Sequence, residues 1–153
     1  MFIYIVTHGE CEDGPDPILN GNGIKQIKSL KIPQEVNMLA SGTGKRFLCV
    51  LKIVQSKLPA MRVIYSPFFG GPERLVGKGQ IILTNGRLLD RSSEYIGAIN
   101  GQINMWPLLK SLRNRTLICA GGALMETLGY SGIHKSGHLY EIDPDTRHGK
   151  MIA

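Results

Sequence analysis

The chain has 153 residues, enough for a substantial core, and we expect one domain over residues 1–153. Hydrophobic residues make up 42% and charged residues 20%, a composition typical of a folded globular protein and not of a disordered chain. The net charge of +6 is spread without a dense run of Lys or Arg. It favours anionic ligands such as phosphorylated small molecules, and no motif for specific nucleic-acid recognition accompanies it.

The cysteines and the hydropathy pattern indicate in which cellular compartment the protein is expected. Cys11, Cys49 and Cys119 lack metal-ligand spacing, and their odd number argues against a disulfide framework. The first ten residues do not resemble a signal peptide, and no run approaches the roughly 20 apolar residues of a membrane span. We therefore expect a cytoplasmic protein with no metal, no cofactor and no membrane partner. The sequence leaves the oligomeric state open and allows a homo-oligomer.

The first stretch, residues 1–10 (MFIYIVTHGE), places the predicted site. Residues 2–6 form a short apolar run typical of a buried strand, and the run ends at Thr7, His8 and Gly9. Ligands in open α/β sheets bind at the carboxyl edge of the strands, where this strand would place the imidazole of His8. Gly9 allows a sharp turn or the close approach of a ligand. A histidine that merely ends a strand would suit this pattern as well.

The next elements alternate between helix and strand. Residues 11–22 have loop composition, residues 22–30 have apolar residues at helical spacing, and residues 35–40 predict a second strand. Residues 47–58 predict a strong amphipathic helix. The loop would bring Glu12, Asp13 and Asp16 near the predicted site, where they could cap or shape it, although acidic loop residues are usually only solvated.

A glycine-rich turn, residues 41–46 (SGTGKR), connects the second strand to the amphipathic helix. The backbone N–H groups at such a helix start favour an anion. The turn is not a P-loop, because Leu39 and Arg46 stand where that motif requires Gly and Ser or Thr. Lys45 and Arg46 are both candidates for binding a phosphate, and the planar fork of Arg46 fits better. The alternative is a solvated helix start.

The second half of the chain continues the alternation. We expect strands at 62–66, 79–83, 116–120 and 137–142, helices in the second half of 99–112 and at 123–128, a loop or lid at 67–79, and a loose tail after Pro144. The pattern predicts the α/β class, as a three-layer α/β/α sandwich with a mainly parallel sheet.

Four segments, in this order, resemble the signature of the histidine phosphatase superfamily, which is phosphoglycerate mutase-like. They are the strand ending in Thr7-His8-Gly9-Glu10, the turn from Ser41 to Arg46, the segment Leu88-Leu89-Asp90, and the strand 116–120 followed by Gly121-Gly122. Residues 18–27 (ILNGNGIKQI) resemble a fifth family segment.

The resemblance implies both a fold and a reaction. The fold is the three-layer sandwich, and the reaction is a phosphoryl transfer in which His8 becomes phosphorylated. Arg46 or Lys45 would grip the phosphate, and Thr7, Gly9 and Gly121 would complete its binding site. Asp90 would protonate the leaving oxygen, with Glu94 as the fallback.

Two departures from the family pattern bear on activity. Thr7 stands where the family has its first Arg, and Ala120 stands where it has its second catalytic His. Residues from elsewhere, for instance Arg74, Arg87 or His138, would have to substitute. By default His134, His138 and His148 read as surface or structural residues.

The resemblance therefore supports two hypotheses. One is a phosphatase that hydrolyses a small phosphomonoester through a phosphohistidine at His8, weak or narrow in substrate. The other is a catalytically lapsed member that binds a phosphorylated metabolite or a protein partner without turnover.

Overall fold

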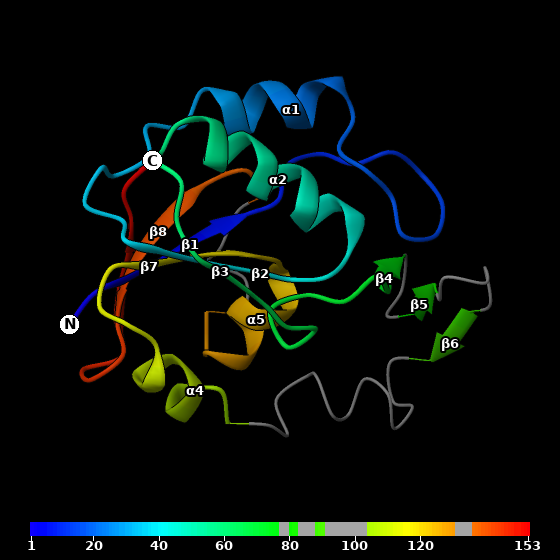
Figure 1. Cartoon of the computed structure of the whole chain (residues 1–153). Coiled ribbons are helices and arrows are strands. Elements are labelled where there is room, and N and C mark those ends of the chain that lie inside the picture. The colour runs from blue at the N-terminus through cyan, green and yellow to red at the C-terminus, as the bar shows by residue number, and fades with distance from the viewer. Residues whose placement is uncertain (77–79, 83–87, 91–103, 131–135) are drawn as a thin grey trace.

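A six-stranded sheet forms the centre of the computed structural model, which describes residues 1–76, 80–82, 88–90, 104–130 and 136–153 (Figure 1). Its strand order is β3-β2-β7-β1-β8-β9. The bounds are β1 (Ile3–Thr7), β2 (Met38–Ser41), β3 (Val63–Tyr65), β7 (Thr116–Ala120), β8 (Leu139–Asp143) and β9 (His148–Met151). Strands β3, β2, β7 and β1 run parallel, whereas β8 and β9 are antiparallel to their neighbours. The mainly parallel sheet expected from the sequence is confirmed.

Helices cover both faces of this sheet. Figure 1 shows α1 (Gly21–Lys28) and α2 (Lys45–Ser56) on one side, and α4 (Trp106–Ser111) and α5 (Gly122–Thr127) on the other. Side chains of β1 alternate between the two cores, with Ile3 and Ile5 on the α4–α5 side and Tyr4 and Val6 on the α1–α2 side. A strand buried on both faces reads as a continuous apolar run, which is why residues 2–6 and 116–120 are recognisable in the sequence. The three-layer arrangement is also confirmed.

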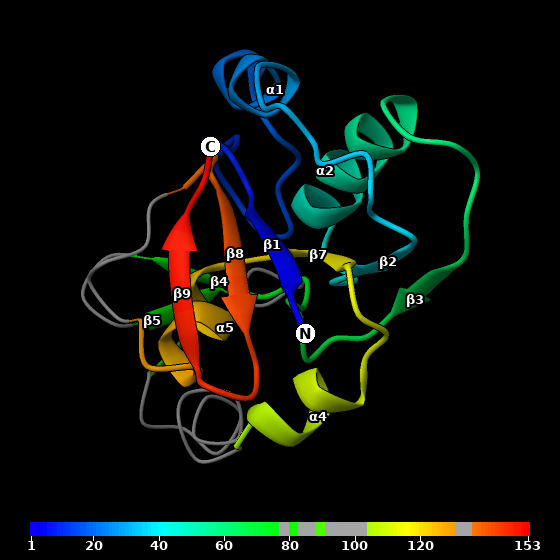
Figure 2. The ribbon, with the colours of Figure 1, turned by 90° about the vertical axis from the view of Figure 1, so that its left-hand side faces the viewer.

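Two expectations about irregular segments are wrong. Residues 67–79 are not all loop, because β4 (Arg74–Val76) pairs with β5 (Gln80–Ile82), which pairs with β6 (Leu88–Asp90) in a separate antiparallel sheet. The segment after Pro144 is not a loose tail, because β9 pairs with β8 and takes the edge position expected for residues 137–142 (Figure 2). The turn between them is held by Asp143 Oδ1, which accepts from the Asp145 N–H at 2.8 Å. This polar turn looks like a disordered tail in the sequence.

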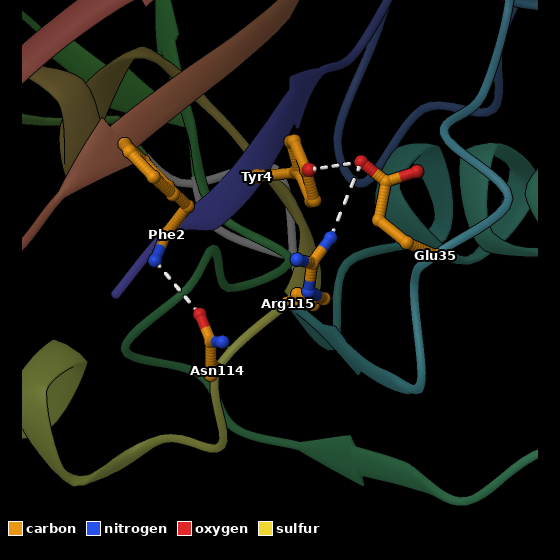
Figure 3. A network of polar contacts seen from close by, with 5 residues as sticks. All are labelled: Phe2, Tyr4, Glu35, Asn114 and Arg115. Atoms are coloured by element: carbon orange, nitrogen blue, oxygen red, sulfur yellow. Dashed lines mark hydrogen bonds and ion pairs between the residues drawn. The ribbon is translucent and has the colours of Figure 1, made fainter.

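A polar network ties together the amino-terminal end of β1 (Figure 3). The Tyr4 hydroxyl donates to Glu35 Oε1 at 2.6 Å, and Arg115 Nη1 lies 3.6 Å from the same oxygen. The Phe2 N–H donates to Asn114 Oδ1 at 2.8 Å, and the Arg115 N–H donates to the Phe2 carbonyl oxygen at 2.7 Å. The loop before β7 and the loop before β2 are therefore both fastened to β1.

Two further expectations from the sequence concern disulfide bonds and membrane-spanning helices. Cys11, Cys49 and Cys119 are all free thiols. Over the residues that the structure describes, no helix combines the length and the apolar character needed to cross a membrane.

Candidate functional site

His8 follows β1 at the carboxyl edge of the main sheet, beside the end of β7. Thr7 and Ala120 are register partners, and the His8 N–H donates to the Ala120 carbonyl oxygen at 3.2 Å. On the other side, the Gly137 N–H donates to the carbonyl oxygen of His8 at 2.9 Å. The backbone of His8 is therefore held on both sides, at the edge where ligands bind in open α/β sheets.

The His8 ring is oriented by its own loop. Nδ1 lies 2.8 Å from the carbonyl oxygen of Gly9. Because a carbonyl oxygen can only accept, this contact places a proton on Nδ1, and the neutral ring then carries its lone pair on Nε2. Cys11 Sγ lies 3.5 Å from the same nitrogen and 3.3 Å from the same oxygen. A partly buried imidazole in this tautomer has the form that nucleophilic attack through Nε2 requires.

Phe47, in the first turn of α2, is the wall of the candidate site. Its ring centroid lies 5.5 Å from that of His8, with the two planes at 76°. The guanidinium carbon of Arg46 lies 4.3 Å from the same centroid. A Cβ atom at Gly121 would come within 3.0 Å of the Phe47 ring and 3.5 Å of the His8 ring. His8, Arg46 and Gly121 therefore meet around one ring, and a side chain at residue 121 would press tightly against it.

Arg46 and Lys45 lie in different environments although they are neighbours. Arg46 is only 7% exposed, and its Nη2 donates to the Glu73 carbonyl oxygen at 3.0 Å. Lys45 is exposed, and its backbone N–H donates to Asp16 Oδ1 at 2.9 Å. The helix start therefore turns the guanidinium of Arg46 inward, toward the ring that also contacts His8.

The glycine-rich turn before α2 differs from the expected anion-binding arrangement. The N–H groups of Thr43 and Gly44 donate to the Gly70 carbonyl oxygen at 2.7 and 3.3 Å. The Lys45 N–H is bonded to Asp16, as described above. These backbone donors have acceptors within the chain, so a ligand at this turn would depend on the Arg46 side chain instead.

The two positions that depart from the family pattern lie inside the packed sheet. Thr7 is buried, and its Oγ1 accepts from the His138 N–H at 3.2 Å and lies 3.3 Å from the His138 carbonyl oxygen. Ala120 is fully buried in the core on the α4–α5 side. Neither residue brings a charge to the edge where His8 lies, and the Thr7 hydroxyl is already bonded to backbone.

Gly9 allows the loop that contains His8 to pack closely against α1. A Cβ atom there would come within 2.8 Å of Gly23 Cα and of Gln26 Oε1. Gln26 Oε1 also accepts from the Glu10 N–H at 2.9 Å. The start of α1, which lies within residues 18–27, therefore packs directly against the loop that orients His8.

Glu73 is a residue that the sequence patterns missed. Its carbonyl oxygen binds Arg46, and its own Oε2 is buried, with no hydrogen-bond partner among the described residues. It lies 27 positions from Arg46. No periodicity marks it, and the one available signal is its place just after Gly70 and Gly71, which pack on the turn before α2.

The candidate proton donors and the residues that could substitute for the missing Arg and His lie in several parts of the chain. Asp90 ends β6 opposite Gln80, and Arg74 begins β4. Glu94, Arg87 and His134 lie outside the described residues. Nδ1 of His138 lies 3.1 Å from the Ala153 carbonyl oxygen, and His148 is exposed on β9. Within the described ranges, no group of three or more His, Cys, Asp or Glu side chains is arranged to hold a metal ion.

Comparison with solved structures gives matches over nearly the whole chain. A phosphoglycerate mutase from Thermus thermophilus superposes with a TM-score of 0.61 at 16% identity, covering 94% of this chain and 93% of that one. A phosphoserine phosphatase from Entamoeba histolytica, in complex with 3-phosphoglyceric acid, gives 0.64 at 14% identity, covering 99% and 95%. The chain has a phosphoglycerate mutase-like fold. The fold that the resemblance implied is therefore confirmed.

Sequence comparison alone does not find this phosphoglycerate mutase-like fold. Neither the protein-family models nor the curated proteins give a match to the sequence. At identities of 14 to 18% the solved structures establish the architecture, and the chemistry must be argued from the side chains.

Proposed function

We propose that this chain is a phosphomonoesterase of the histidine phosphatase type, in which His8 Nε2 attacks the phosphorus of a small phosphate ester. The observation that carries the proposal is the arrangement around Phe47. His8 has its proton on Nδ1, and the inward-facing guanidinium of Arg46 lies against the same ring. A nucleophile and a planar cation beside one wall are the two groups that phosphoryl transfer needs first.

The reaction would proceed in two steps. The lone pair on His8 Nε2 attacks phosphorus, the ester P–O bond breaks, and the leaving oxygen takes a proton. Water then attacks the phosphohistidine, the P–N bond breaks, and inorganic phosphate leaves. The Gly9 carbonyl oxygen holds the proton on Nδ1 throughout, and Arg46 spreads the negative charge of the transferring group. The proton donor that the resemblance implies is Asp90.

The phosphate-binding set is smaller than the resemblance implied. Arg46 is the grip, because it faces inward while Lys45 faces solvent. Gly121 leaves room beside Phe47, and Gly9 acts through its carbonyl oxygen on His8. The hydroxyl of Thr7 is bonded to the backbone of residue 138. The phosphoserine phosphatase with a similar fold binds 3-phosphoglyceric acid, which supports a phosphorylated ligand here.

Turnover should be slow. Removing one group that stabilises transition-state charge lowers kcat by roughly 100- to 1,000-fold, and this site has neutral residues at two such positions. The burial of Ala120 and the bonded hydroxyl of Thr7 also support a second candidate function, a protein that binds phosphate esters without hydrolysing them.

Phosphate release from a panel of phosphomonoesters distinguishes the two functions. The native protein is compared with His8→Ala and His8→Asn, and tungstate affinity is measured by calorimetry for all three. We expect turnover in the native protein alone, with an acid-labile phosphoryl group on His8 after rapid quenching. Tungstate binding without turnover would favour the binding protein, and loss of both would contradict each function.

A further inference from the structure

Glu73 lies beside the phosphate grip of the candidate site. It directly precedes β4, and its carbonyl oxygen accepts from Arg46 Nη2 at 3.0 Å. The guanidinium of Arg46 in turn lies on the ring of Phe47, which contacts His8. Because the carboxyl group of Glu73 is only one side chain away from its own carbonyl oxygen, it lies at the margin of the same site.

One of the two oxygens of the Glu73 carboxyl group is in an unusual environment. Its Oε2 atom is buried, and no donor among the described residues bonds to it. Arg46 contacts the backbone of Glu73 through Nη2, so that bond does not serve this oxygen. A buried polar atom without a partner is unfavourable and requires an explanation. An alcohol or hydroxyl oxygen of a bound ligand would supply one.

We infer that Glu73 is the residue that exchanges a proton with the leaving oxygen and then with the attacking water. The inference rests on the proposed function and assigns to Glu73 the role that the resemblance gives to Asp90. In the first step the ester P–O bond breaks, and the leaving oxygen takes the proton of the Glu73 carboxyl. In the second step the Glu73 carboxylate takes a proton from the water that attacks the phosphohistidine, which restores the starting state.

Dependence on the leaving group tests this role directly. An alkyl phosphate releases a strongly basic alkoxide and needs a proton, whereas p-nitrophenyl phosphate releases a stable phenolate that does not. Removing a general acid lowers rates by roughly 100-fold or more. We expect Glu73→Gln to lose about this factor in kcat for the alkyl ester, and less than about tenfold for the nitrophenyl ester. A merely structural role would slow both esters equally.

Two further measurements guard against a misfolded variant. Because Arg46 is held by the backbone carbonyl of residue 73, Glu73→Gln should keep the tungstate affinity and thermal midpoint of the native protein. Asp90→Asn tests the competing donor, and Glu141→Gln, on β8 beside Lys150, is the control for loss of a remote carboxylate.

The outcomes separate the inference from the function. Leaving-group dependence in Glu73→Gln and not in Asp90→Asn would support Glu73. The reverse, or equal slowing of both esters by Glu73→Gln, would overturn its role and leave the function standing. An absence of His8-dependent turnover in the native protein would overturn both.

Discussion

The two ends of β1 contrast in how their polar groups are satisfied. At the amino-terminal end, the Tyr4 hydroxyl and the Arg115 guanidinium converge on one carboxylate, Glu35 (Figure 3). At the carboxyl end, Glu73 Oε2 is buried without a partner among the described residues, and Arg46 binds a backbone carbonyl. The first end uses opposite charges to join loops, whereas the second contains a buried carboxyl oxygen without a hydrogen-bond partner among the described residues.

This difference indicates where stability and function separate in the molecule. Pairing every polar group strengthens a fold, whereas functional sites commonly retain groups whose partner is a ligand. Variants at the amino-terminal end should therefore change stability without changing turnover. Variants at the carboxyl end should change turnover and anion binding more than stability. Four predictions test this comparison.

Replacing Arg46 should have the largest effect on function. Arg46→Gln removes the planar cation next to His8, so we expect kcat/KM to fall by roughly 100- to 1,000-fold and tungstate affinity to fall with it. Steady-state kinetics and calorimetry measure the two losses. Lys45→Gln should change both values little, because that side chain is exposed. Lys52→Gln, an exposed cation further along α2, is the control for net charge. Equal losses in the Lys45 and Arg46 variants would contradict the assignment.

Alkylation of Cys11 should have the next largest effect on turnover, after replacement of Arg46. Its sulfur lies 3.5 Å from His8 Nδ1, so a carboxamidomethyl group there would displace the ring or the Gly9 carbonyl. A misplacement of about 1 Å can lower rates on the order of 100-fold. Iodoacetamide should slow turnover by this order, and tungstate should protect the protein.

The other two cysteines supply the controls for this experiment. Burial raises the pKa of the Cys119 thiol, which should not react in the folded protein. Cys49 is partly buried on α2, and its modification should leave turnover intact. A Cys11→Ala variant that is inactivated as fast as the native protein would show that another site is responsible.

The sequence predicted the elements that carry local patterns and missed those made by distant contacts. The strand before His8 is a continuous apolar run and the helix that begins at Lys45 has a clear helical periodicity, and the structure confirms both. Because the turn after Asp143 is polar, β9 was mistaken for part of a loose tail. Because the segment around Gly70 and Gly71 is rich in glycine, β4 was mistaken for part of a loop. Turns and paired strands of this kind depend on a partner elsewhere in the chain.

The candidate site shows the same limit. His8 could be proposed because it ends an apolar run, and Arg46 because it opens a helix. Glu73 and the wall at Phe47 could not, because their contacts join segments that are far apart in the sequence. The sequence placed Asp16 near the site, and the structure adds its particular contact, in which its Oδ1 accepts from the Lys45 N–H at the start of the helix.

Tyr4→Phe should lower stability while leaving turnover unchanged. The lost hydrogen bond to Glu35 should reduce the free energy of unfolding by about 1 kcal/mol at pH 7. Burial, together with Glu35, raises the pKa of Tyr4 from 10.0 to about 12. The folded state therefore keeps a proton that the unfolded state loses, and this stabilisation falls as pH rises from about 10 to about 12.

The stability gap between the native protein and Tyr4→Phe should consequently narrow over that pH range. Urea unfolding at a series of pH values measures it. A gap that stays constant up to pH 12 would contradict the raised pKa, and a change in turnover would weaken the proposed separation between the two ends.

Arg115 should have the smallest effect, and its backbone separates two contributions. Its ion pair with Glu35 is partly exposed, so its loss in Arg115→Ala should reduce the free energy of unfolding by less than about 1 kcal/mol. Arg115 also has a φ of 68°, in the left-handed region that favours glycine. Arg115→Gly loses the same ion pair but relieves this strain, which is about 1 kcal/mol or more for a residue with a side chain. Urea unfolding should therefore find Arg115→Gly at least as stable as Arg115→Ala. The opposite order would mean that relief of the left-handed backbone at residue 115 does not outweigh the conformational freedom that glycine adds to the unfolded chain.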